Sequence, residues 1–103
     1  MTLDLTLVHA GRDAFNRGEW FEAHELWERV WLVAAPPEKT YLQGLIQICA
    51  ALLKLAQRRE DLYASLLARA LGKLSSADSF AGLDVPGLRE ALARGLPLGP
   101  LRL

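Results

Sequence analysis

The chain has 103 residues, 51% of them hydrophobic, so it can bury one core and does not have the composition of a disordered segment. Twelve basic residues balance twelve acidic ones, whereas proteins that bind nucleic acid through phosphate contacts normally carry a basic excess, so nucleic acid is a disfavoured partner. The longest apolar-rich stretch, residues 42–56, is shorter than the roughly 20 residues that cross a bilayer and is interrupted by Gln43, Gln47 and Lys54, so we expect no membrane span.

Helical periodicity and helix-end signals predict five helices, and no segment has the pattern of a strand. The predicted ranges are 5–16, 19–34, 38–58, 61–75 and 85–94, followed by an irregular tail over 96–103. Asp4 and Asp84 are placed to cap the first and fifth helices, Gly18 ends the first, and a double proline separates the second from the third. Because the connections between the first four helices are short, we expect antiparallel neighbours in one all-α domain, a compact array or bundle covering residues 1–103.

The first two predicted helices are expected to form a hairpin like those of tetratricopeptide proteins. Gly18 would make the turn, the small Ala23 would let the helices approach closely, and Trp27 would wedge between them. No second unit of this kind follows, and a solenoid needs about three, so the likeness concerns packing alone.

The second predicted helix contains three Trp residues and is apolar around most of its circumference. At 100° per residue only Glu22, Glu25 and Arg29 form a plainly polar face, which predicts a helix central to the domain. His24 and Glu28 lie one turn apart with apolar side chains on both sides, and a buried carboxylate is costly unless it is paired. Three interpretations follow: a structural His–Glu hydrogen bond in a Trp-lined core, a ligand- or metal-binding site, or a pair exposed to solvent.

The third predicted helix is apolar except for a narrow strip that holds Gln43, Gln47, Lys54 and Arg58, and the two glutamines are again one turn apart. This strip has two interpretations. It either faces solvent, or it turns inward to meet His24 and Glu28 and forms a polar pocket between two helices.

Two motifs carry a resemblance to a known family. Residues 15–31, with the sequence FNRGEWFEAHELWERVW, resemble the signature F-N-x-G-x-[YW]-[FY]-E-A-H-E-x-[LW]-E-x-x-W of the bacterial family called domain of unknown function 309. Residues 41–47 match the second signature of that family, a Q-G-L-I-Q run on the next helix. The two motifs cover about residues 15–51, and the resemblance implies a small all-helical domain without a settled activity.

The polar positions of the two motifs, together with Trp31 at the end of the first motif, form one candidate set in this chain. Its polar members are Glu22, His24, Glu25, Glu28, Gln43 and Gln47. The family pattern has a histidine after the second signature and a Gly-Asn before the fourth helix, whereas this chain has Lys54 and Arg59-Glu60 near those places. If that histidine belongs to a metal site in the family, this chain lacks one ligand.

The favoured function is a small intracellular, non-catalytic interaction or ligand-binding domain, with a buried His-Glu-Gln cluster and a protein partner or a second copy of the chain. The alternative is a metal-dependent hydrolase that uses His24, Glu25 and Glu28, because His-Glu-x-x-Glu resembles the zinc motif H-E-x-x-H. A divalent metal would then be held by His24 and Glu28. Since the second ligand is a glutamate and no third is evident, we predict no cofactor and favour the non-catalytic function.

Cysteine content and the N-terminal residues bear on the cellular compartment. The single cysteine, Cys49, lies in an apolar run, cannot form an internal disulfide and is expected to be unreactive. No basic stretch precedes an apolar segment at the N-terminus, so we expect no signal peptide and a cytoplasmic protein. Nine arginines against three lysines suggest a GC-rich bacterial source.

Overall fold

The computed structural model describes residues 3–94 and 101–103, and this part of the chain is all-α, as expected. Its helices are α1 (Leu5–Asn16), α2 (Trp20–Trp31), α3 (Glu38–Ala56), α4 (Glu60–Leu74) and α5 (Val85–Ala93). The expected irregular tail falls mainly on residues 95–100, outside the described residues. Residues 101–103 have no regular secondary structure.

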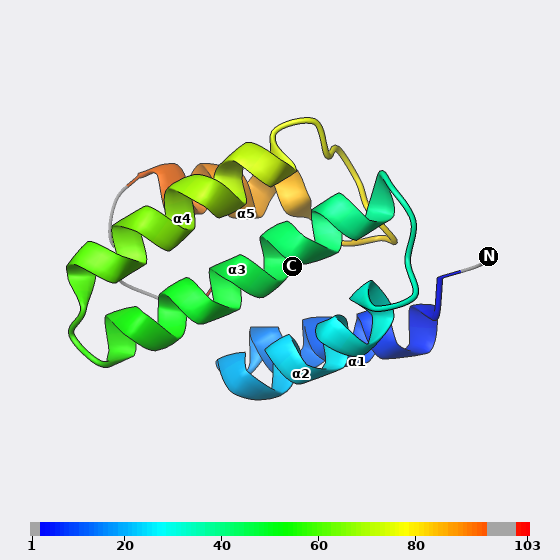
Figure 1. Cartoon of the computed structure of the whole chain (residues 1–103), viewed down its shortest axis with the longest axis horizontal. Helices are drawn as coiled ribbons and strands as arrows, with labels where there is room; N and C mark the ends of the chain where they lie inside the picture. Colours follow the sequence, from blue (N-terminus) through cyan, green and yellow to red (C-terminus); the bar gives the residue numbers. More distant parts are fainter. Residues whose placement is uncertain (1–2, 95–100) are drawn as a thin grey trace.

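Successive helices pack as antiparallel neighbours around α3 (Figure 1). The α1–α2 hairpin packs on one side of α3, and α4 packs along the other side, with α5 beside α4. Both α2 and α3 have a neighbouring helix on each side, but α3 buries seven of its residues and α2 only three, so the expectation that the second helix is the central one is wrong.

The signals at the helix ends act as the sequence indicates. The carboxylate of Asp4 accepts a hydrogen bond from the backbone N–H of Leu7 at 3.1 Å, and that of Asp84 accepts one from Gly87 at 3.0 Å. Gly18 has a φ of 79°, the left-handed conformation that ends α1 and reverses the chain into α2.

Two helices are shorter than their predicted ranges. α2 was expected over 19–34 but ends at Trp31, because residues 33 and 34 each donate to the carbonyl three residues earlier and so form a tight turn. α3 was expected to reach residue 58 but ends at Ala56, because Arg58 takes a φ of 61° and directs the chain into α4. The remaining helix ends differ from prediction by one residue at most, within the usual uncertainty of helix boundaries.

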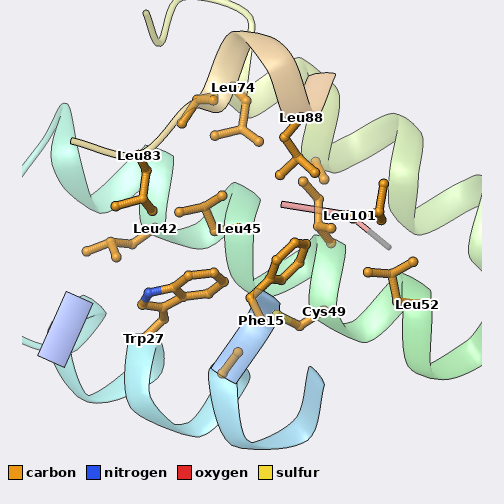
Figure 2. Close-up of a cluster of buried hydrophobic side chains, with 14 of the residues drawn as sticks. Phe15, Trp27, Leu42, Leu45, Cys49, Leu52, Leu74, Leu83, Leu88 and Leu101 are labelled. Carbon is orange, nitrogen blue, oxygen red and sulfur yellow. The ribbon is translucent and has the colours of Figure 1, made fainter. Parts of the chain in front are cut away.

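The core joins the α1–α2 hairpin to the leucine-rich faces of α3 and α4 (Figure 2). Trp27 is fully buried, packs 5.9 Å from the ring of Phe15, and donates its indole N–H to the carbonyl of Val8 at 3.0 Å. Its indole lies against the backbone at Gly11, where an added Cβ would be 2.6 Å from Cδ1. The expected roles of Gly18 in the turn and of Trp27 against α1 therefore hold, and Ala23 is also fully buried.

The segments after α4 close the far end of this core. Phe80 is 5% exposed and packs edge-on to Tyr41 with ring centroids 5.7 Å apart, as expected for a loop residue that plugs the core. His9 on α1 donates from Nε2 to the carbonyl of Ala81 at 2.8 Å, which fixes the loop to α1.

The outer side of α2 faces solvent, which corrects the expectation of a helix buried on nearly all sides. Phe21, Leu32 and Val33 are exposed by 63%, 63% and 61%, and the side chain of Glu28 is 48% exposed. No polar or charged residue is buried in the part of the chain that the structure describes, so the expected cluster is half-buried rather than enclosed. None of the described helices is long and apolar enough to cross a bilayer.

Candidate functional site

Three of the candidate residues on α2 form one stripe along the helix. His24, Glu28 and Trp31 are spaced i, i+4 and i+7, so helical geometry puts them on one face. His24 and Trp31 are half-buried and Glu28 is more exposed, because this face lies beside α3 at the surface of the molecule.

A matching stripe runs along α3. Gln43, Gln47, Ala50 and Lys54 are spaced i, i+4, i+7 and i+11, and all four are half-buried. Since α2 and α3 are antiparallel, the start of one stripe lies beside the end of the other (Figure 1). The polar strip of α3 therefore lies along α2 and is half-buried.

Two adjoining hollows occupy the line between the stripes, and we refer to them together as the α2–α3 groove. The first, the Trp31 hollow, has a volume of about 180 Å³ and is lined by Glu28, Trp31, Gln43, Ile46 and Gln47. This hollow brings together four of the seven residues singled out from the sequence.

The second hollow, the Lys54 hollow, lies toward the N-terminus of α2 and the C-terminus of α3. Its volume is about 340 Å³, and it is lined by Phe21, His24, Ala50, Leu53, Lys54 and Gln57. His24 thus belongs to a different hollow from Glu28, although the two side chains touch.

The contact between His24 and Glu28 is close but is not a hydrogen bond. Nδ1 of His24 lies 3.5 Å from Oε2 of Glu28, and the geometry leaves this buried nitrogen without a hydrogen-bond partner. The structural hydrogen bond expected in a dry core is therefore absent from this arrangement. The imidazole instead stands between the two hollows with Glu28 on its Nδ1 side.

Three residues that line this groove carry a buried side-chain nitrogen or oxygen without a hydrogen-bond partner in the protein. The described residues contain four such atoms, and three of them are Nδ1 of His24, Nε1 of Trp31 and Oε1 of Gln47. The fourth is the hydroxyl of Tyr63 on α4. Because an unpaired buried polar atom costs about 1–3 kcal/mol, three at one place require a local explanation.

The indole of Trp31 also has a charged neighbour. The Lys39 ammonium lies 4.4 Å from the centroid of the Trp31 ring, a distance suited to a cation–π interaction. This contact uses the face of the ring, and Nε1 at the edge of the ring is buried without a hydrogen-bond partner in the protein.

The remaining two predicted positions, Glu22 and Glu25, are exposed and line neither hollow. Glu22 lies 3.5 Å from Arg17, and a hydrogen bond with Glu19 raises the pKa of Glu22. The pKa of Glu19 is lowered, chiefly by its hydrogen bond with Arg17. Glu19 and Glu22 form a surface cluster with Arg17 at the start of α2, away from the groove.

Sequence reasoning missed several residues of the groove. Lys54 was placed on the polar strip of the third predicted helix but was not included in the candidate set, and Phe21 was not singled out, yet both line the Lys54 hollow. The available signal was the i, i+4, i+7, i+11 spacing on α3, which extends the glutamine pair to Lys54.

The donor set available to a metal ion is small. Within residues 3–94 and 101–103, no three His, Cys, Asp or Glu side chains are grouped closely enough to hold a metal. Lys54, at the place where the family pattern has a histidine, lines the same hollow as His24 and brings a positive charge that opposes a cation there.

Comparison with known proteins assigns the family. No curated protein matches the chain. The family model described as "Domain of unknown function (DUF309)" matches residues 8–66, which include most of α1, all of α2 and α3, and the first turns of α4. Both stripes of the α2–α3 groove lie inside the matched region. The chain therefore belongs to the DUF309 family.

Proposed function

We propose that this chain is a non-catalytic binding domain and that the α2–α3 groove is its binding site. The observation that carries the proposal is the concentration in the groove of three of the four buried, unpartnered side-chain polar atoms of the described residues. A ligand that supplies hydrogen bonds to these three atoms would be stabilised by them.

The chemistry of the Trp31 hollow indicates what kind of group would fit. Nε1 of Trp31 can only donate, and Oε1 of Gln47 can only accept. A group that fills this hollow must therefore bring both an acceptor and a donor, as an amide does. The volume of about 180 Å³ is below the usual range of small-molecule pockets and suits a single amide-sized group.

A non-catalytic role agrees with the side chains present. Glu25, the residue that would act as the general base of a zinc hydrolase, lies on the exposed side of α2 outside both hollows. His24 and Glu28 touch but have no third acidic or imidazole neighbour grouped with them among the described residues.

The proposal can be tested by NMR with N-methylacetamide as the probe, because it presents one carbonyl and one N–H. We expect the indole N–H signal of Trp31 to shift along a saturating curve at tens of millimolar probe. The indole of Trp27, which already donates to Val8, is the internal control and should not shift. Trp31→Phe assigns the responding signal. Equal, linear shifts of both indoles would contradict the proposal.

The 3.5 Å contact between His24 and Glu28 favours one second candidate, a metal-dependent hydrolase using His24, Glu25 and Glu28. Calorimetric titration with Zn²⁺, Mn²⁺ and Mg²⁺ tests it. Saturable binding that is abolished by His24→Gln and by Glu28→Gln would support this candidate. Absence of heat for all three ions would remove it.

We also propose that binding takes place in the cytoplasm of a bacterium. The support is the single Cys49, which is buried and unpaired and therefore fits a reducing compartment. The partner that brings the amide group is then a polypeptide or a small molecule of that compartment, and a second copy of this chain is one such polypeptide. Fractionation of the source cells tests the location.

A further inference from the structure

Lys54 lines a hollow, and its ammonium group has no counter-ion among the described residues. Its side chain is half-buried, lines the Lys54 hollow and makes no ion pair with any residue that the structure describes. Its position in the last turn of α3 is favourable for a positive charge because of the helix dipole. The dipole alone does not explain why this lysine lines a hollow between two helices.

The walls around Lys54 have the make-up of a small-molecule site. Phe21, Ala50 and Leu53 supply apolar surface, and His24 and Gln57 supply polar groups beside the ammonium. Binding pockets combine mainly apolar walls with a few polar groups, and about 340 Å³ falls at the lower end of their size range. Phe21 is 63% exposed, so one wall is an aromatic ring held open to solvent.

The charges in this hollow select the head group of a ligand. Its lining contains one permanent cation and no carboxylate. Glu28 touches His24 but lines the Trp31 hollow instead. A single ammonium matches a single negative charge, whereas a phosphate dianion is usually held by several cations or by a cluster of backbone N–H groups. The complementary ligand is therefore a monoanion with an apolar body.

We propose that the Lys54 hollow binds a carboxylate attached to an apolar group, with the Lys54 ammonium as its counter-ion and Phe21 and Leu53 against the apolar group. His24 and Gln57 add hydrogen bonds at the carboxylate. The inference rests on the proposed function, because it assigns a ligand class to one half of the α2–α3 groove. The carboxylate belongs either to a free small acid or to the C-terminus of a polypeptide.

The test is an NMR titration of the ¹⁵N-labelled chain with benzoate and with benzamide, which has the same ring and no charge. We expect saturable shifts at the backbone amides of residues 21–24 and 50–57, with benzoate binding at least tenfold more tightly than benzamide. Because this comparison uses the unaltered chain, it does not depend on how a variant folds. Equal affinities of the two probes would overturn the inference.

Two variants that each remove one lysine charge test the role of the Lys54 ammonium. Lys54→Met keeps most of the aliphatic stem and should weaken benzoate at least tenfold while leaving benzamide unchanged. Lys73→Met is the control, because Lys73 is also a basic residue in the last turn of its helix but lines neither hollow. A loss of benzoate affinity that is equal in both variants would contradict a specific counter-ion role for Lys54.

Two further arms identify the source of the carboxylate and separate this inference from the proposed function. The peptide acetyl-Ala-Ala-Phe with a free C-terminus would bind at least tenfold more tightly than benzoate if the natural ligand is a polypeptide end, and no more tightly if it is a small acid. The amidated peptide should bind weakly in either case. If benzoate and benzamide bind equally while N-methylacetamide still shifts Trp31, only the carboxylate inference fails. If Trp31 also fails to respond, the proposed function fails as well.

Discussion

Replacing Gln47 by leucine is expected to stabilise the protein, although it removes a polar residue from the surface groove. Oε1 of Gln47 is buried without a hydrogen-bond partner, and such an acceptor costs about 1–3 kcal/mol. Since the side chain as a whole is half-buried, we expect the substitution to add about 1 kcal/mol of stability, the lower end of that range. For a domain of this size that corresponds to a rise in Tm of about 4–8 °C.

The assay is thermal unfolding by circular dichroism, together with urea denaturation. Gln43→Leu is the matched control, because Gln43 lines the same hollow but has no buried unpartnered atom, and it should change Tm little. Gln47→Leu should also lose the response of the Trp31 indole to N-methylacetamide, so stability and binding change in opposite directions. An unchanged or lower Tm for Gln47→Leu, or equal shifts for both variants, would refute the reasoning.

Three other predictions concern the core and the helix ends. Gly11→Ala should destabilise the fold by about 1–3 kcal/mol in urea denaturation, because the new Cβ meets the indole of Trp27; a variant as stable as the parent would show that the indole can move aside. Burial raises the pKa of the Cys49 thiol, so the thiol should stay protonated between pH 7 and 9. It should then react with Ellman's reagent only as fast as the protein unfolds, and a rapid reaction in the native state would contradict this prediction. Asp84→Ala should cost about 1 kcal/mol by removing the cap on Gly87, and no loss of Tm would show that α5 is held by packing alone.

The elements of the fold could be predicted from the sequence because their signals are local. Asp4 and Asp84 cap helices, Gly18 takes a left-handed conformation, and the double proline separates two helices, all through interactions within a few residues. The ends of α2 and α3 were predicted less well. They are fixed by a tight turn after Trp31 and by the left-handed Arg58, a conformation that arginine rarely takes.

The candidate site was predictable only as two separate stripes. The spacing of His24, Glu28 and Trp31 fixes their common face on one helix, and that of Gln43 and Gln47 fixes theirs on another. Membership of the DUF309 family covers both stripes but does not state how they lie relative to one another.

Tertiary packing decided which neighbour each face meets. Angles about the axis of α2 could not show that this helix packs against α1 and α3 with its outer side in solvent, or that α3 buries seven residues and α2 only three. That arrangement leaves Phe21 and Glu28 exposed at the edge, and it sets the polar stripe of α3 beside that of α2. The sequence by itself determined the helices and the faces of their side chains. The packing of α2 on α3 alone decided that two polar faces enclose a groove, because only side chains from both helices can form its walls.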